Sequence, residues 1–393
     1  MFNIDTFHQQ GDSVEELIEP ATHFMNQHDA SLILCFATPD VVDNLSQWDI
    51  KTNNKNRYIA VSSCLGSATE KKLSLENQSV SLFCIEDKHG HYGVAQCEKS
   101  HNLRANASET VLRAINNADR MGIAPKMIWC FQTPGNEEEV LQGIQDAVGT
   151  RIPIFGGSCA DNDLTGQWQF ATQTDTYKQG FVVAVLYPSV ETSGFYSSGY
   201  DKTPLGGIVT NVKGRTLNTI DNHPAMDVYN HWREQLGFAV LADGNILSES
   251  TSAPLARSLP SSDDIPRLLL SHPAKASKGS IELFSTLNEG DSVSLVSGTK
   301  KQLVKRAEMV IASLLKQAAY GSIKSIEGVI IIFCGGCMLS IQEAMQEVQS
   351  SLSAQLPGTP YIMGFTFGEF GSFDDSTSRF GNLMITCEIF GSR

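Results

Sequence analysis

The motif Cys334-Gly335-Gly336-Cys337 holds the side chains best suited to chemistry in this sequence. It follows an apolar run typical of a buried strand and precedes a helical pattern. A thiol at the start of a helix meets the positive end of the helix dipole, which lowers its pKa and favours the thiolate. Cys334 and Cys337 therefore allow thiol–disulfide chemistry or metal binding, and they equally fit small residues at a tight turn. One CxxC cannot complete a four-thiolate zinc site.

Three glycine-rich segments each follow an expected strand: residues 62–67, 156–159 and 364–371. In α/β sheets, ligands sit at the carboxyl ends of strands, where glycine lets backbone groups approach them. Neither GxGxxG nor GxxxxGK[ST] is present, so no motif supports nucleotide binding. Glu369 equally suits a buried acid paired with a loop N–H. The predicted contacts to a small ligand are Gly156, Gly157, Ser158, Cys159, Arg215, Thr366, Gly368 and Glu369, with Arg215 available for a carboxylate.

The sequence contains no motif that identifies an enzyme. HExxH and HxxxH pairs are absent, which argues against a helical zinc site, and neither a GxSxG elbow nor a kinase signature occurs. We therefore expect a protein that is not an enzyme. The rival hypothesis is a thiol oxidoreductase in which one of Cys334 and Cys337 attacks and the other resolves.

Composition narrows the class of protein. The 393 residues carry a net charge of −14, which argues against broad nucleic-acid binding and against docking on an anionic membrane. The longest apolar stretches, 181–187 and 329–333, are far shorter than the roughly 20 residues of a membrane span. No signal peptide is evident, and nine cysteines suggest reduced thiols. We expect a cytoplasmic α/β protein.

Hydrophobic periodicity predicts alternating strands and helices in the first half of the chain. An opening helix begins at a capping box formed by Ser13 and Glu16. The further expected elements are a strand at 31–37, a helical patch at 41–48, a strand at 57–67, a hairpin of 78–87 with 91–98, and a helix at 108–120.

An internal echo, meaning a similar order of expected elements, links the two halves of the chain. Strand, helix and strand are expected at 127–131, 136–148 and 152–155, and again at 329–333, 340–352 and 360–363. Between them we expect strands at 181–187 and 194–200, a hairpin over 206–220, a helix with Pro224 at its first position, a surface loop over 243–264, strands at 265–270, 280–284 and 291–298, and a helix at 300–319 capped by Thr299.

These elements predict an α/β fold of two lobes with mixed β-sheets flanked by helices, and the echo suggests internal duplication. The lobes are expected to meet near residues 211–224, with a ligand in a cleft lined by the glycine loops and not at the 243–264 loop. The predicted division is an N-terminal helix at 1–28, a first domain at 29–220 and a second at 221–393.

The same segments, taken in order, resemble the FIST family, a FIST N domain followed by a FIST C domain. The resemblance is carried by residues 64–67, 155–161, 180–186, 214–225, 228–229, 271–273, 289–291 and 364–371. It covers roughly residues 29 to 372. The resemblance implies a sensory module of intracellular signal transduction that binds a small ligand such as an amino acid.

The chain also resembles a stand-alone subgroup described as haem-binding nitric-oxide sensors, in its Cys334–Met338 segment and its His272-Pro273 pair. That resemblance implies haem b as a cofactor and regulation of a histidine kinase or a cyclic-di-GMP signalling protein. A haem needs one strong axial ligand. The candidates for the iron are His272, then His223 and His231, with a Cys334 or Cys337 thiolate as another option. The alternatives are an amino-acid-like ligand without haem and a redox switch at Cys334 and Cys337.

Overall fold

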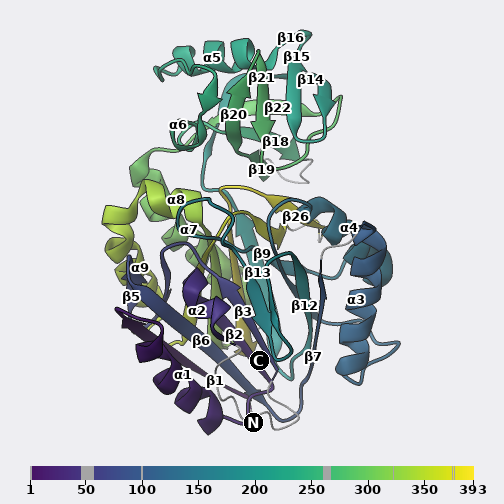
Figure 1. Cartoon of the computed structure of the whole chain (residues 1–393), viewed down its shortest axis with the longest axis vertical. Coiled ribbons are helices and arrows are strands. Elements are labelled where there is room, and N and C mark those ends of the chain that lie inside the picture. The colour runs from purple at the N-terminus through teal and green to yellow at the C-terminus, as the bar shows by residue number, and fades with distance from the viewer. Residues whose placement is uncertain are drawn as a thin grey trace.

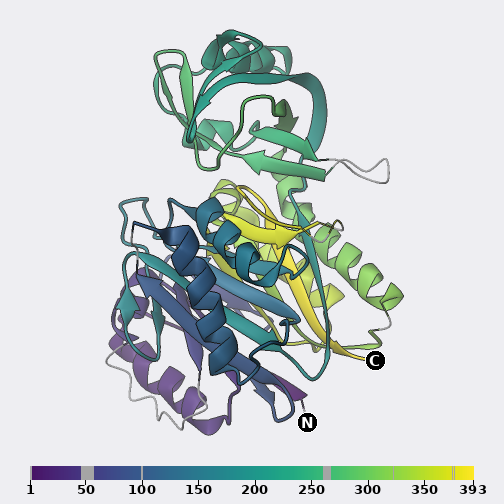
Figure 2. The ribbon, with the colours of Figure 1, turned by 90° about the vertical axis from the view of Figure 1, so that its right-hand side faces the viewer.

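The computed structural model describes residues 2–45, 57–98, 101–259, 267–321, 323–373, 375 and 377–393. An upper lobe and a larger lower body make up the molecule (Figures 1 and 2). The lower body contains both ends of the chain, and the upper lobe contains residues 201–297. In the described residues, no helix combines the length and apolar character needed to cross a membrane.

The lower body repeats one order of elements three times. The first repeat comprises β1 (Phe2–Gly11), α1 (Glu15–Gln27), β2 (Leu32–Ala37), α2 (Pro39–Asp43), β3 (Tyr58–Ser62), β4 (Gly66–Thr69), β5 (Leu73–Leu75) and β6 (Gln78–Asp87). The second comprises β7 (His91–Glu98), α3 (Leu103–Asn117), β8 (Met127–Gln132), α4 (Glu137–Val148), β9 (Ile154–Ser158), β10 (Phe170–Thr172), β11 (Thr176–Tyr177) and β12 (Gly180–Tyr187).

The third repeat contains the upper lobe as an insertion between its first strand and first helix. It comprises β13 (Glu191–Ser197), α7 (Lys300–Tyr320), β23 (Ser325–Cys334), α8 (Gly335–Ser340), the 3-10 turn Gln342–Ala344, α9 (Met345–Gln355), β24 (Tyr361–Thr366), β25 (Glu369–Ser372), β26 (Ser378–Gly381) and β27 (Ile385–Ser392). The lobes are therefore joined at residues 200–201 and 297–299, and not near residues 211–224.

Strand pairing confirms the equivalence of the repeats. The three six-stranded sheets have the orders β1-β6-β2-β3-β10-β11, β7-β12-β8-β9-β25-β26 and β13-β27-β23-β24-β4-β5. In each sheet the third and fourth strands are parallel and the other pairs are antiparallel. The last two strands of each sheet come from another repeat. The mixed α/β fold is as expected, and the echo between the two halves is part of a threefold pattern.

The three sheets enclose a common core and carry helices outside. Leu34, Trp129 and Ile332, from one sheet each, belong to the same buried cluster. Helix α1 covers the outer face of the first sheet, α3 and α4 that of the second, and α7 and α9 that of the third (Figure 1). Apolar residues on one stripe of each helix are buried against the sheet, as the 3.6-residue period requires.

The upper lobe has its own core around Leu217, Tyr229 and Leu295. Its nine-stranded sheet follows the order β17-β20-β21-β15-β14-β22-β18-β19, with β16 beside β15. Its elements are β14 (Asp201–Lys213), β15 (Thr216–Ile220), β16 (His223–Pro224), α5 (Ala225–Gln235), β17 (Gly244–Asn245), α6 (Leu247–Ser250), β18 (Leu255–Leu259), β19 (Arg267–Ser271), β20 (Pro273–Ser277), β21 (Ser280–Leu283) and β22 (Ser292–Ser297).

Several expected elements need correction near the N-terminus. The chain opens with β1 and not with a helix, because this edge strand alternates only weakly and is held by pairing with β6. Helix α1 has no side-chain cap from Ser13. Segments 78–87 and 91–98 are strands, but they pair with β1, β2 and β12 and form no hairpin with each other. Helix α3 starts at Leu103 with Asn102 as its cap, five residues before the expected start.

The C-terminal half needs one correction that bears on function. Segment 243–264 was expected as a surface loop, yet its described part contains β17, α6 and β18. These elements are too short to show a period, and distant strands such as β20 and β22 hold them. Pro224 is the N-cap of α5 and not its first residue. The capped helix after Thr299 is confirmed, with a capping box to Gln302. The expected helical patch at 41–48 extends beyond the described residues.

Candidate functional site

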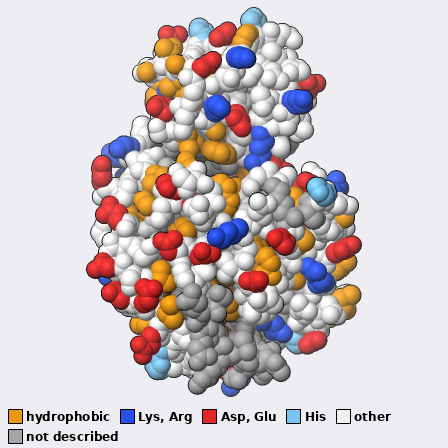
Figure 3. All heavy atoms as spheres, viewed as in Figure 1, with side chains coloured by type: hydrophobic (Ala, Val, Ile, Leu, Met, Phe, Trp, Pro, Cys, Tyr) orange, Lys and Arg blue, Asp and Glu red, His pale blue; other side chains and the backbone are white. Residues whose placement is uncertain are grey.

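A cavity of about 1070 Å³ lies where the upper lobe meets the lower body. Hydrophobic side chains gather at this junction on the face shown in Figure 3. The upper lobe contributes His272, Phe284 and segment 245–252 to the lining, and the lower body contributes Trp168, Cys334, Phe367 and Asn382. Segment 243–264, where no ligand site was expected, therefore contributes to the lining of this cavity.

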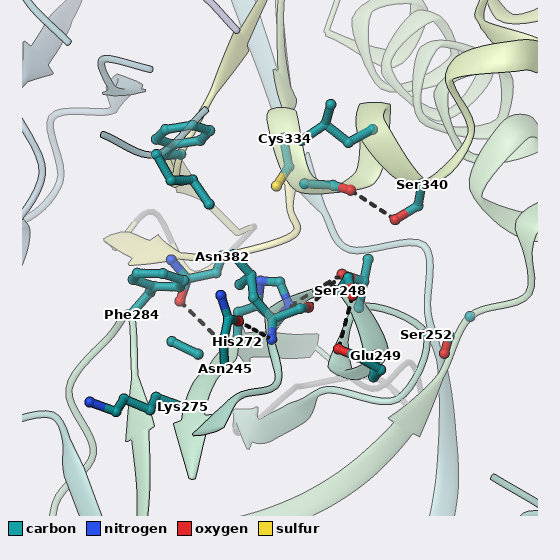
Figure 4. Close-up of a pocket in the computed structure, with 18 of the residues that line it drawn as sticks. Asn245, Ser248, Glu249, Ser252, His272, Lys275, Phe284, Cys334, Ser340 and Asn382 are labelled. Carbon is teal, nitrogen blue, oxygen red and sulfur yellow. Dashed lines mark hydrogen bonds between the residues drawn. The ribbon is translucent and has the colours of Figure 1, made fainter. Parts of the chain in front are cut away.

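His272 and Asn382 form one wall of the cavity and connect the two lobes (Figure 4). The His272 backbone N–H donates to Asn382 Oδ1 at 3.3 Å, and the Asn382 backbone N–H donates to the Leu270 carbonyl at 3.0 Å. The His272 side chain contacts the Leu247 carbonyl through Nε2 at 3.0 Å. Burial lowers the pKa of His272 to about 4, so the ring is neutral near pH 7.

The two cysteines of the CxxC motif occupy different places. Cys334 ends β23 and reaches the cavity, with its sulfur pointing from the start of α8 toward the open space (Figure 4). Cys337 lies behind it, fully buried, with its sulfur 3.5 Å from the Tyr200 hydroxyl. That hydroxyl donates to the carbonyl of Thr251 in the upper lobe at 2.7 Å. Cys337 is thus linked to the junction between the lobes.

Arg306 is a cation whose charge acts on both cysteines of this motif, and it is buried inside the lower body. Its guanidinium donates to the carbonyls of Ser198 at 3.2 Å, Leu383 at 2.9 Å and Met384 at 3.4 Å. Burial alone would raise the pKa of Cys337, but the hydrogen bond from Cys334 and the charge of Arg306 lower it. Burial and the bond to Cys337 hold the pKa of Cys334 well above its usual range. Cys337 is therefore the better thiolate.

An ion-pair cluster bridges the lobes on another side of the cavity. Arg215, in the turn between β14 and β15, contacts Glu137 at 2.5 Å and Glu138 at 2.7 Å at the start of α4. Glu138 also accepts the backbone N–H of Thr286 at 2.6 Å. Ser158 donates to Glu137 at 2.7 Å. Two carboxylates already neutralise Arg215, so its guanidinium is not free to bind a ligand carboxylate.

The other predicted ligand residues lie where the three repeats cross over. Backbone hydrogen bonds join one segment of each repeat into a ring at this crossing: Ala160 N–H to the Ser62 carbonyl at 2.9 Å, Cys64 N–H to the Phe365 carbonyl at 3.0 Å, and Phe367 N–H to the Ser158 carbonyl at 3.0 Å. Glycine is needed at this crossing because the backbones approach each other closely. At Gly156, whose φ is +132°, a Cβ would lie 1.9 Å from the Cys130 carbonyl oxygen.

Of the predicted ligand residues, Arg215 alone lines the cavity. The remaining seven are buried behind it: Gly156, Gly157, Ser158, Cys159, Thr366, Gly368 and Glu369. Glu369 accepts the Met384 N–H at 2.9 Å and the Thr366 hydroxyl at 3.0 Å, which matches the alternative of a buried acid. Burial raises its pKa well above the usual range. Asn382, Trp168 and Phe284 line the cavity without having been predicted, because no local motif marks them.

The histidines proposed for haem differ in position. His223 and His231 are exposed in the upper lobe and outside the cavity lining. His272 reaches the cavity, but its Nε2 is bonded to the Leu247 carbonyl. The Cys334 thiol is protonated because its pKa is raised, and Cys337, the better thiolate, is fully buried and outside the cavity lining. None of these candidates therefore offers a free axial ligand to a haem in the cavity. The residues present do not fit a haem in this arrangement.

Haem binding has a direct spectroscopic test. From this geometry we expect no saturable Soret band when haem is added to the purified protein, because His272 would first have to leave the Leu247 carbonyl. A saturable one-to-one band in the wild type that disappears in His272→Ala would contradict this expectation. It would show that His272 reorients and binds the iron.

Sequence and structure comparisons identify the family. Among curated proteins, none matches the chain. Solved structures include a chorismatase with 9% identity and a TM-score of 0.40, covering 100% of this chain and 99% of that chain. A cyanuric acid hydrolase has 10% identity and a TM-score of 0.38, covering 100% of both chains. The FIST N domain matches residues 31–223 and the FIST C domain matches residues 225–372. The chain therefore belongs to the FIST family, whose domains are associated with signal transduction and small-ligand sensing.

Proposed function

We propose that this protein is a non-enzymatic sensor that binds a small organic ligand in the cavity between the lobes. The observation that supports this proposal is that both lobes line the cavity. Polar contacts already join them there, between Arg215 and Glu137 and between Tyr200 and Thr251. A ligand that touches both lobes favours the arrangement to which it binds more tightly, and this differential affinity is what a sensor requires.

The ligand state would be read by another protein. The family resemblance suggests a histidine kinase or a cyclic-di-GMP signalling protein as the partner and the cytoplasm as the location. The ligand expected from the cavity is organic, either amino-acid-like or of another class, because the haem candidates do not present an axial ligand. Autophosphorylation of the partner kinase, compared with ligand-free and ligand-bound protein, tests this step. Equal effects of both forms would contradict a sensor role.

Gly336 offers a way to close the cavity without disturbing the fold. A Cβ at this position would meet Leu383 at 3.5 Å, the Cys334 sulfur at 3.7 Å and His272 Cε1 at 3.8 Å, which are ordinary contacts. A leucine side chain at 336 would therefore project into the space between Cys334 and His272. Glu347, exposed on α9, provides a matched position for Leu outside the cavity.

We expect Gly336→Leu to abolish ligand-induced stabilisation. In a thermal-shift screen with the standard amino acids, uracil and indole, a probe at 100 times its Kd should stabilise the wild type by about 2.7 kcal/mol. The same probe should not stabilise Gly336→Leu and should still stabilise Glu347→Leu. A shift that persists in Gly336→Leu would place binding elsewhere, and no shift with any probe would count against the proposed site.

A redox role for the CxxC motif is the second candidate, favoured by the lowered pKa of Cys337 beside Arg306. In this reaction the two thiols lose two electrons and two protons to a peroxide, which yields a Cys334–Cys337 disulfide and water. Cys334 reaches the cavity, so an oxidant could enter there. The pair would act either as a thiol oxidoreductase or as a switch on the sensor.

A further inference from the structure

We infer that the His272–Asn382 wall of the cavity recognises a neutral ligand with a carbonyl next to an N–H group, as in a lactam or an imide. This inference rests on the proposed function, since it names the ligand class of the same cavity. It depends on one unpaired donor and one unpaired acceptor that lie on adjoining residues of the two lobes.

The donor is Asn382 Nδ2. The residue is 3% exposed and lines the cavity, and Nδ2 has no hydrogen-bond partner among the described residues. The His272 backbone N–H donates to Oδ1, which fixes the amide with its NH₂ group as the free end. A buried donor left unpaired costs about 1–3 kcal/mol. A ligand oxygen that accepts a hydrogen bond from Nδ2 removes this cost, so the bond contributes more to binding than a bond to a solvated donor.

The acceptor is His272 Nδ1. Nε2 lies 3.0 Å from the Leu247 carbonyl, which can only accept, so Nε2 carries the proton of the neutral ring. Nδ1 therefore bears a lone pair, and no hydrogen bond to it is found within the described residues. The His272 backbone bond to Asn382 brings this acceptor and the Asn382 donor to one wall. Such a pair complements an N–H beside a C=O.

The surroundings favour an uncharged and flat ligand. Phe284 packs edge-on against the His272 ring with centroids 6.1 Å apart, and Trp168 and Phe367 form a second edge-on pair at 6.3 Å. No charged residue contacts Asn382 or the His272 ring through a hydrogen bond in the described structure. Two charged lining residues, Glu137 and Arg215, pair with each other. The charged lining residues Glu249, Lys275 and Lys300 are exposed.

Uracil is a suitable probe because it is flat, neutral and has carbonyls beside N–H groups. Its dimethylated derivative, in which both N–H groups carry methyls, removes the donors. By ligand-observed NMR and calorimetry we expect uracil to bind the wild type and the dimethylated derivative to bind roughly tenfold more weakly, as expected for one lost hydrogen bond. Asn382→Asp should weaken uracil by a similar factor, because it replaces the donor with an acceptor.

Asn116→Asp is the matched control, since Asn116 is exposed on α3 and lies outside the cavity lining. It should leave the Kd of uracil unchanged. Equal binding of uracil and its dimethylated derivative, or an unchanged Kd in a folded Asn382→Asp variant, would overturn the inference. If indole binds the wild type but not Gly336→Leu while uracil does not bind, the inference fails and the proposed cavity function stands. If no probe binds, both fail.

Discussion

Replacing Glu388 with Gln should make the protein more stable at high pH, and the gain should grow with pH. Glu388 lies fully inside the core shared by the three sheets, where Trp129 Nε1 donates to its Oε2 at 2.7 Å. Its Oε1 has no partner in the described structure. The small space around it is lined by apolar residues, Gly156 and Thr386, with no charged neighbour. Burial raises the pKa of Glu388 from 4.5 to about 8.

The direction in which the free energy of unfolding changes with pH follows from proton binding. Between about pH 4.5 and 8 the folded state keeps the Glu388 proton while the unfolded state loses it. The free energy of unfolding therefore falls as the pH rises through this range. A pKa shift of this size lowers the free energy of unfolding by about 5 kcal/mol over the whole range, at about 1.4 kcal/mol for each pH unit. Glutamine keeps an acceptor for Trp129 and does not ionise.

The measurement is urea unfolding of wild type and Glu388→Gln at about pH 5 and about pH 8. The difference in unfolding free energy should move by about 4 kcal/mol in favour of the variant. Other groups titrate in both proteins and cancel in the difference. Glu343→Gln, at an exposed position, should show a difference that does not depend on pH. Parallel pH profiles for wild type and Glu388→Gln would contradict a neutral buried Glu388.

Replacing Arg306 with Met should destabilise the protein by about 3–5 kcal/mol. The guanidinium satisfies three buried carbonyls and lies 4.3 Å from the centre of the Phe333 ring, and methionine can replace only the packing. Lys305→Met, on the same helix but exposed, should change stability by no more than about 0.5 kcal/mol. Chemical unfolding measures both. A loss under about 1 kcal/mol in Arg306→Met would contradict this account.

The same variant tests the redox candidate. Without the Arg306 charge, the pKa of Cys337 should rise and its ultraviolet thiolate absorbance should fall. Mass spectrometry after mild peroxide treatment should then show slower formation of the Cys334–Cys337 disulfide. If Arg306→Met does not fold, Arg306→Gln removes the charge but keeps an N–H donor for the buried carbonyls, and it gives the same comparison. Disulfide formation at the wild-type rate in a folded variant without the Arg306 charge would show that this charge does not promote the reaction.

The sequence by itself determined most of the local elements. Periods of two and 3.6 residues and local caps identified the strands at 31–37 and 181–187 and the helix after Thr299, because such signals lie within one segment. The ordered short motifs also pointed to the FIST family, which the domain matches confirm. The alternation of expected strands and helices gave the α/β class. These features depend on neighbours in the chain.

Only the tertiary structure decided which strands pair and where the cavity lies. The glycine loops look alike whether they hold a ligand or carry the chain from one sheet to the next. The backbone hydrogen bonds from Ala160 to Ser62, from Cys64 to Phe365 and from Phe367 to Ser158 show the second use. The third repeat was hidden because the upper lobe separates β13 from α7. Asn382 and His272 are 110 residues apart, and a contact over that separation leaves no local pattern. The cavity exists because two separately packed lobes meet, and no single segment encodes that meeting.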